Sequence, residues 1–375
     1  MSYSQQNKPK ILIGFLNKNS RGPIPTVTKA FIEGLSEKYN FYPFFMERRF
    51  GNTRLSKMNM FNLLYFIAHL SRWIYSIIII RPDIVHFPVT SNLNFEKSMS
   101  FLMVGKIFGC KTIGHLHGGG FIDFIKTLSK TRRNFANYFL SKLDSLIVLS
   151  NSWKHKVIQL FPFIEMKVYV VPNPIDEEFE NFFKEFHRNN ENINILSVGI
   201  MGREKGVLDI LEVAKINNNE KVKFILIGPE REPEINKTCK KFIDKNNLHN
   251  KVIITGAKWG NEKINFYKDS SIFLLPSYIE NFPVVILEAA ASRMAIIATP
   301  IGALPDYFID NYSIKYVQPG NIQSIADAVQ QVVADKKFRA FISNNANVVF
   351  RTELSRTNIF SSLNLVYANV QAPKT

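Results

Sequence analysis

Short apolar runs rich in β-branched residues alternate with longer helical stretches along the whole chain. This alternation predicts an α/β fold in which parallel sheets are covered by helices on both faces. The strands expected in the first half are 10–16, 41–46, 83–87, 111–116, 145–149 and 167–171. Those expected in the second half are 194–198, 222–227, 251–255, 271–275, 295–298 and 313–317.

A chain of 375 residues is long for one hydrophobic core, so two domains are expected. Residues 171–192 have two prolines followed by a charged, Asn-rich run, which suits a connection between domains. We therefore expect two doubly wound domains, 1–172 and 173–354. Ligands of such sheets bind beyond the carboxyl ends of the strands, so a shared site would lie in a cleft between the domains.

Positive charge is concentrated in the first domain. Residues 1–172 contain 23 Lys and Arg against 8 Asp and Glu, whereas the remainder contains 24 against 23. Such a field favours an anionic partner, which could be nucleic acid, an acidic membrane surface or a phosphorylated substrate. Two cysteines are too few for a disulfide framework, and no export signal is visible, so we expect a cytoplasmic protein.

The stretch 61–80 is the most membrane-like part of the sequence. His69, Ser71 and Arg72 lie near its middle and make a membrane-spanning helix costly. We expect a buried helix followed by a strand here, with membrane contact as the alternative.

Several chemistry-bearing motifs are missing from the sequence. There is no P-loop, the glycines at 118–120 form only a weak dinucleotide fingerprint, no Asp-x-Asp occurs, and no closely spaced Cys/His cluster resembles a zinc site. We therefore expect no metal and no bound cofactor.

The segment 197–206, SVGIMGREKG, follows one expected strand and precedes a helix. Its glycines allow a tight turn and close approach of the backbone to a ligand, and Arg203 and Lys205 supply cations. The segment is either a diphosphate clamp or an ordinary loop with solvated charges.

The segment 278–290, YIENFPVVILEAA, has two carboxylates in an apolar run. We expect Pro283 to begin a helix that is apolar on every face except at Glu288. A buried carboxylate requires a partner, which is either a cation or a ligand with hydroxyl groups. Glu280 precedes the helix, whose free N–H groups favour a phosphate. Alternatively, Glu280 is a loop residue and Glu288 faces water.

His117 follows the expected strand 111–116 in the sequence HLHGGGF. Its place at the carboxyl end of a strand makes it a candidate for the site, although a lone histidine there is more often structural.

Taken in order, these segments resemble the retaining GT-B glycosyltransferases of family 4. The most specific element is the pair Glu280 and Glu288 separated by seven residues. Supporting segments are 144–157, 168–176, 197–206 and 273–308, and the last helix, within 355–375, is similar to the one that crosses back to the first domain in this family.

The resemblance implies roles for individual residues. Glu288 would accept hydrogen bonds from the ribose of a nucleotide sugar, and Lys205 would neutralise its diphosphate. Glu280 would hold sugar hydroxyls, Gly22 would let the first loop pass close to the donor, and His117 would lie beside the reacting carbon. The backbone that holds the sugar and phosphate would be that of Asn281, Phe282, Pro283 and Val284.

Three positions depart from the family pattern. Ile200 replaces an arginine, so that either Arg203 reaches the diphosphate or donor affinity is weaker. Arg293 replaces a glycine and Asp306 a glutamate, which affects the expected donor geometry but not the fold.

The implied reaction transfers a hexose from a UDP- or GDP-linked donor to an acceptor hydroxyl with retention of the anomeric configuration, and needs no metal. The basic, aromatic-rich segment 121–142 suits a helix against anionic lipid headgroups. We therefore expect a polyprenyl-diphosphate-linked or glycan acceptor in bacterial surface glycan synthesis, at the inner face of the cell membrane.

Three other functions are compatible with parts of the sequence. One is a sugar-nucleotide epimerase or phosphorylase of the same fold, and another is a non-catalytic subunit, suggested by Ile200. Nucleic-acid binding explains the charge but not the paired glutamates, so we expect no nucleic-acid partner.

Overall fold

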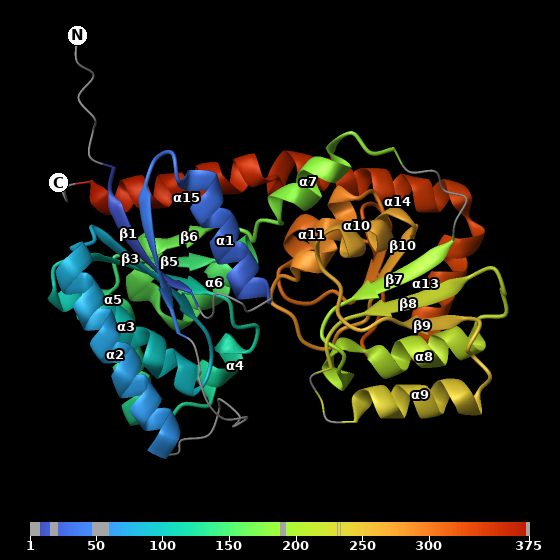
Figure 1. Ribbon diagram of the computed structural model, residues 1–375, viewed down its shortest axis with the longest axis horizontal. Coiled ribbons are helices and arrows are strands. Elements are labelled where there is room, and N and C mark those ends of the chain that lie inside the picture. The colour runs from blue at the N-terminus through green and yellow to red at the C-terminus, as the bar shows by residue number, and fades with distance from the viewer. Residues whose placement is uncertain are drawn as a thin grey trace, which may run out of the picture. The chain divides into compact units, whose positions relative to one another are not determined.

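The computed structural model describes residues 8–15, 22–46, 60–187, 193–230, 232 and 234–372. Contacts divide the chain into two compact units (Figure 1). Unit 1 comprises Met1–Pro174 and Arg356–Thr375, and unit 2 comprises Ile175–Ser355. The sequence placed these divisions after residues 172 and 354.

Each unit contains one parallel sheet of six strands within the described residues. The strands of unit 1 are β1 (Lys10–Phe15), β2 (Asn40–Phe45), β3 (Ile84–Val89), β4 (Lys111–Leu116), β5 (Ser145–Val148) and β6 (Val168–Val170). Those of unit 2 are β7 (Asn194–Val198), β8 (Lys223–Ile227), β9 (Val252–Ile254), β10 (Ile272–Leu275), β11 (Ala295–Ala298) and β12 (Lys315–Tyr316). The twelve expected strands are confirmed, with every end within two residues of its expected position.

The strand order makes both sheets doubly wound. It is β2-β1-β3-β4-β5-β6 in unit 1 and β12-β11-β10-β7-β8-β9 in unit 2, with every pair parallel. The order reverses between β1 and β3 in the first sheet and between β7 and β10 in the second. In open α/β sheets such reversal points are where ligands bind, outside the carboxyl ends of the strands.

Helices cover both faces of the first sheet (Figure 1). Phe31 and Tyr367, from the first and last helices of the unit, contact His86 of β3. Trp73 and the Phe101 ring contact Phe87, the next residue of the strand, which points to the opposite face. The helices are α1 (Pro23–Leu35), α2 (Met60–Ile80), α3 (Leu93–Ile107), α4 (Phe121–Lys126), α5 (Lys130–Lys142), α6 (Asn151–Leu160), the 3-10 helix Pro162–Lys167 and α15 (Arg356–Gln371).

The last helix, α15, follows unit 2 in the sequence but packs in unit 1, as the family resemblance implied. Ile359, Leu363 and Tyr367 of this helix are buried, and Tyr39 donates a hydrogen bond to Oδ1 of Asn364 at 3.0 Å.

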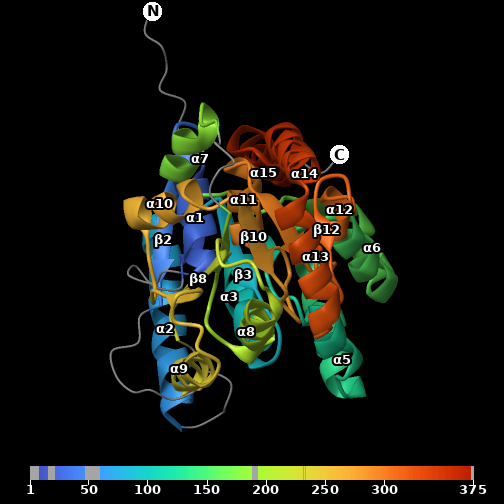
Figure 2. The same ribbon diagram turned by 90° about the vertical axis from the view of Figure 1, so that its right-hand side faces the viewer.

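The second sheet is likewise covered on both faces, with α8 and α9 opposite α10 and α11 (Figure 2). Apolar side chains of α8, α9 and α13 form one core cluster with Ile195, Phe224 and Ile272. On the other face Tyr267 stacks on Phe273, with 5.8 Å between ring centroids. The helices are α7 (Glu177–Lys184), the 3-10 helix Arg203–Lys205, α8 (Val207–Ile216), α9 (Ile235–Lys245), α10 (Gly260–Lys268), α11 (Val284–Ala291), α12 (Leu304–Tyr307), α13 (Ile322–Ala334), α14 (Lys336–Val349) and the π-helix Phe350–Leu354.

Helix α2 differs from its sequence-based prediction. Residues 60–80 form one helix, so the strand expected within 61–80 is absent, and the buried residues of the helix are only His69, Trp73 and Ile77. These three residues are four apart and therefore form a single stripe, which explains why the helix packs on one side and is not enclosed. By length and composition, α2 is the one helix in the described parts of the chain that could cross a membrane.

Candidate functional site

Two loops of unit 2 meet at the reversal point of its sheet. One follows β7 and contains residues 199–206, and the other follows β10 and contains residues 276–283. The Tyr278 N–H donates to the Glu204 carbonyl at 2.9 Å. Gly206 has a φ of 69°, and a Cβ there would lie 2.4 Å from the Pro276 carbonyl oxygen. Close packing of the two loops therefore requires glycine at position 206.

Lys205 and Glu280, predicted from two separate motifs, form an ion pair in this loop pair. Lys205 Nζ donates to Glu280 Oε1 at 2.6 Å and to the Ile279 carbonyl at 3.3 Å. Ser277 Oγ donates to the same carboxylate oxygen at 3.2 Å. The Lys205 side chain is 23% exposed and that of Glu280 is 14% exposed, so both remain within reach of a ligand.

The segment from Asn281 to Val284 forms the corner before α11. Pro283 caps the helix, and Val284 is its first residue, one position later than the sequence predicted. The first N–H groups of the helix have no carbonyl partner within it, an arrangement that favours an anion. Phe282 is buried and stacks on Tyr307 at 5.0 Å, and the Asn281 carbonyl accepts a hydrogen bond from Ala303, which fixes the corner.

Glu288 has partners within the protein. Its side chain is buried, Lys263 Nζ donates to Oε1 at 2.5 Å, and the Tyr267 hydroxyl donates to Oε2 at 2.8 Å. The alternative in which Glu288 faces water is therefore wrong, because a cation and a hydroxyl from α10 contact its carboxylate. Burial and the Glu288 carboxylate together hold the pKa of Tyr267 well above its usual value, which keeps this hydroxyl a donor.

Lys263 and Tyr267 were not among the site residues predicted from the sequence. They are four residues apart and therefore lie on one face of a helix. This spacing was the sequence signal that both side chains could contact the same group.

Arg203 lies on the loop with Lys205 but has a separate partner. Its backbone N–H donates to Glu232 Oε1 at 2.8 Å, and its Nε lies 3.7 Å from Glu232 Oε2. The Arg203 side chain is 64% exposed, so this pair is a weak surface contact from which the guanidinium can be released at small cost.

The two remaining candidates, His117 and Gly22, lie in unit 1. Gly22 caps α1 with extended backbone, and among the described residues a Cβ there would lie near Pro25, at 3.9 Å. The loop before it, 16–21, is outside the described residues.

His117 belongs to a row of three histidine rings. His117 and His115 lie 4.1 Å apart between ring centroids, His115 Nδ1 is 3.3 Å from His86 Nε2, and His86 Nδ1 is 2.8 Å from the Tyr367 hydroxyl. Burial lowers the pKa of His117 to about 4 and that of His86 to about 3. The pKa of His115 also falls well below its usual value, mainly through burial. These rings are neutral at pH 7 and suit hydrogen bonding better than charge stabilisation.

Within the described residues, no group of three or more His, Cys, Asp or Glu side chains is arranged to hold a metal ion.

The two doubly wound units have the GT-B architecture, and a cation, a carboxylate and a helix N-terminus lie at the reversal point of the second sheet. Two family profiles match the chain: "Glycosyltransferase Family 4" over residues 36–179 and "Glycosyl transferases group 1" over residues 178–349. The chain belongs to the GT-B glycosyltransferases of family 4.

Relatives and solved structures agree with this assignment. The chain is 26% identical to the capsular polysaccharide biosynthesis glycosyltransferase CapM of Staphylococcus aureus, over 62% of this chain and 65% of CapM. It is 25% identical to the UDP-Gal:alpha-D-GlcNAc-diphosphoundecaprenol alpha-1,3-galactosyltransferase of Escherichia coli, over 66% of each chain. The structure of a glycosyltransferase from Rickettsia africae has a TM-score of 0.78 at 18% identity, covering 98% of this chain and 100% of that one.

The chain spans about three fifths of the length of the curated relatives it matches. The structural similarity at 18% identity shows the fold alone.

Proposed function

We propose that the chain is a retaining glycosyltransferase that moves a hexose from a UDP- or GDP-linked donor to the hydroxyl of a lipid-linked or polysaccharide acceptor. The ion pair of Lys205 and Glu280 is the observation that carries this proposal, because it places a cation and a hydrogen-bond acceptor beside the first turn of α11. Family membership and the names of the relatives support the donor class and a role in bacterial surface glycan synthesis.

In the proposed reaction, the donor diphosphate takes Lys205 away from Glu280. Lys205 and the first N–H groups of α11 then balance the charge that develops on the diphosphate as the anomeric C–O bond breaks. Glu280, released from its ion pair, accepts hydrogen bonds from hydroxyls of the transferred sugar. The bond to the acceptor oxygen forms on the face that the diphosphate leaves, and the acceptor proton passes to the departing phosphate oxygen.

The other predicted residues have supporting roles in this proposal. His117 lies beside the reacting carbon as a neutral hydrogen-bonding group, and Arg203 leaves Glu232 to join the diphosphate in place of the arginine missing at Ile200. Glu288 keeps Lys263 and Tyr267 and turns a remaining lone pair toward the ribose. The reaction uses no metal, because fixed cations and N–H groups supply the charge that a metal would provide.

We place the reaction in the cytoplasm, at the inner face of the cell membrane. Helix α5 exposes Lys130, Arg132 and Lys142 together with the aromatic rings of Phe135 and Tyr138. A mixed basic and aromatic face of this kind suits anionic headgroups and would hold the enzyme near a polyprenyl-diphosphate-linked acceptor.

Nucleotide binding by calorimetry tests the donor site. UDP or GDP should bind the wild-type chain, and Lys205→Met should weaken binding about tenfold to a hundredfold, the range for one charged hydrogen bond. Lys215→Met, an exposed lysine in the last turn of α8, is the matched control and should leave the affinity unchanged.

Glu280→Gln separates the two roles in the ion pair. It should leave UDP or GDP affinity equal or higher, since Lys205 is no longer neutralised, while transfer to an acceptor falls. Absence of binding by both nucleotides, or an unchanged affinity in Lys205→Met, would show that the site is misassigned. Transfer in the presence of EDTA tests metal independence, and the anomeric configuration of the product, read by NMR, tests retention.

A further inference from the structure

Helix α2 presents an apolar face to solvent. Its exposed positions all carry apolar side chains except Ser71 and Arg72, and Phe61 and Ile79 are 71% and 64% exposed. The exposed apolar residues form two groups, separated by Ser71 and Arg72: Met60, Phe61, Leu63, Leu64, Ile67 and Ala68 in the first, and Tyr75, Ile78 and Ile79 in the second. Contiguous exposed apolar surface on this scale marks an interaction site.

The opposite side of α2 is fixed to unit 1. Trp73 is fully buried, its indole N–H donates to the Phe101 carbonyl at 2.9 Å, and its ring packs edge-on against Phe44 and Phe87. Insertion across a membrane would break these contacts and leave the Trp73 donor unpaired. The helix is about 30 Å long and therefore presents its apolar face lengthwise while it stays packed on the domain.

The charge of the domain decides which partner fits this face. Residues 1–172 have 23 Lys and Arg against 8 Asp and Glu, and α2 itself contains no acidic residue. A second copy docked on α2 would bring two strongly positive domains together, which is unfavourable. An anionic bilayer instead offers acyl chains for the apolar face and phosphates for the surrounding cations.

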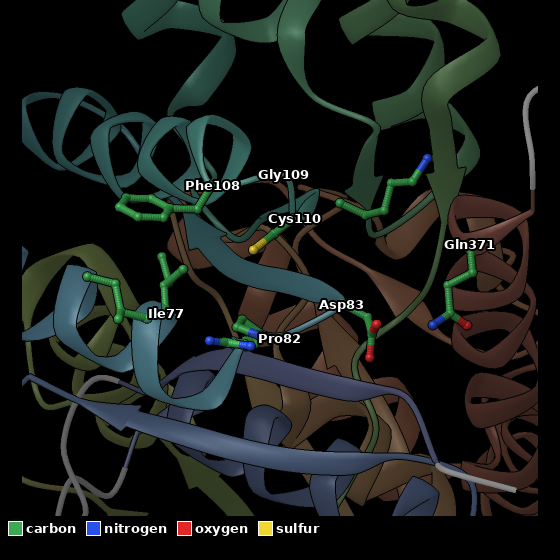
Figure 3. Close-up of a pocket in the computed structure, with 10 residues that line it drawn as sticks. Ile77, Pro82, Asp83, Phe108, Gly109, Cys110 and Gln371 are labelled. Carbon is green, nitrogen blue, oxygen red and sulfur yellow. The ribbon is translucent and has the colours of Figure 1, made fainter.

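Cations and apolar surface continue beyond the end of α2. A pocket of about 690 Å³ is lined there by Ile77, Ile78 and Phe108, with Arg81 and Lys111 among its other lining residues. Figure 3 shows Ile77 and Phe108 on one side of this pocket and Asp83 on the other. The apolar surface therefore extends from α2 to the end of α3, and basic side chains accompany it.

The topology connects this face to the site. Helix α2 connects β2 to β3, parallel strands that lie on either side of β1 in the sheet, so it runs back from the edge where the strands end. Its first residues, around Phe61 and Leu64, therefore lie toward the same edge of the sheet as His117, which follows β4. A membrane that covers α2 would bring a lipid-held acceptor to that edge.

We infer that α2 lies in the plane of an anionic phospholipid surface, with Phe61, Leu64, Ile67 and Ile78 inserted among the acyl chains and Arg72 and Arg81 at the phosphates. The inference rests on the proposed function and deepens it. It names α2 as the helix that inserts into the membrane, and it attributes membrane affinity to burial of apolar side chains as well as to charge.

Vesicle flotation of the full chain, without nucleotide or acceptor, tests the inference. The wild type should float with phosphatidylcholine vesicles containing phosphatidylglycerol and much less with phosphatidylcholine alone. The triple variant Phe61→Ser, Leu64→Ser and Ile67→Ser should bind the anionic vesicles at least about tenfold less, since three inserted apolar side chains are lost. These side chains are not buried in the fold, and circular dichroism checks that the variant remains folded.

The matched control substitutes three exposed apolar residues of unit 2, Ile216→Ser, Ile309→Ser and Val348→Ser, and should bind vesicles like the wild type. Insertion is measured directly with Leu64→Trp, whose fluorescence should be quenched by brominated acyl chains, whereas that of Ile309→Trp should not.

Four results would overturn the inference: no flotation of the wild type, equal binding to uncharged vesicles, full binding by the triple variant, or a wild-type dimer in ultracentrifugation that the triple variant abolishes. Calorimetry with UDP and GDP reads the donor site in unit 2 independently. Loss of flotation with intact nucleotide binding therefore rejects the role of α2 alone, and the reverse result rejects the proposed donor site alone.

Discussion

The buried Glu288 should make unit 2 depend on Lys263. The substitution Lys263→Met keeps an unbranched chain of similar length against the rings of Phe179 and Tyr267, each 5.7 Å from the ammonium group. Of the two partners Lys263 and Tyr267, the substitution leaves only the Tyr267 hydroxyl to the Glu288 carboxylate. Glu288 is only 2% exposed. Removal of one partner from a buried ion pair costs about 3 kcal/mol, because the other charge stays in a poorly solvated site.

Hydrogen exchange of the full chain measures this loss of stability locally, in the helices around Glu288. Amides of α10 and α11 should exchange about 100-fold faster in Lys263→Met, the factor that corresponds to about 3 kcal/mol of local stability. Amides of β3 and β4 in unit 1 should not change. Replacement of the whole pair, Lys263→Met with Glu288→Leu, should recover most of the protection, since an apolar pair in such a site is nearly neutral.

Lys258→Met is the matched control for this prediction. Lys258 pairs with Glu262 at 3.0 Å, but the Glu262 side chain is 67% exposed, so the loss should be below about 1 kcal/mol. Equal exchange in Lys263→Met, Lys258→Met and the wild type would refute the reasoning, since Glu288 would then not rely on its cation.

Three further predictions concern the two loops and the histidine row. The pKa of His86 is about 3 in the folded chain, below its ordinary 6.5, so the unfolded chain binds a proton at this residue first as the pH falls. Unit 1 should therefore keep its full stability above about pH 6.5 and lose about 3 kcal/mol from His86 alone by pH 4. Urea unfolding midpoints measured across this pH range test the prediction. Gly206→Ala should destabilise unit 2 by about 1–3 kcal/mol, because its Cβ would meet the Pro276 carbonyl, whereas Gly199→Ala, with open space at its Cβ, should change the thermal midpoint little. Tyr367→Phe should cost about 1–3 kcal/mol in urea unfolding, since it leaves buried His86 Nδ1 without its hydroxyl partner.

The strands were predictable because their signal is local. Runs such as 194–198 and 295–298 combine β-branched residues with flanking polar turns, and burial on both faces of a parallel sheet selects that composition. The same signal gave a wrong prediction within 61–80, where the isoleucines near the end of the stretch favour a strand by propensity. There the stripe of Trp73 and Ile77 packs on unit 1, and this tertiary contact determines the helix.

The candidate site was predictable only in part. Loops after β7 and β10 could be placed together because ligand sites follow strand ends, and Lys205 and Glu280 do meet there. The partners of Glu288 were not predicted, because a lysine on a surface helix, such as Lys263, usually faces water. Proximity between residues so far apart in sequence is set by packing of the helices, which the local pattern does not specify.

The position of α15 has a consequence for synthesis on the ribosome. Unit 1 begins at the start of the chain, yet Leu363 and Tyr367, which complete its packing, are translated only after all of unit 2. Until then Phe31, Tyr39 and His86 lack the side chains that cover them in the finished domain. Unit 2 is uninterrupted in the sequence and has no such delay. The part of unit 1 that is translated first therefore remains an incomplete domain with exposed aromatic side chains until α15 is made. A chaperone would matter most at this stage.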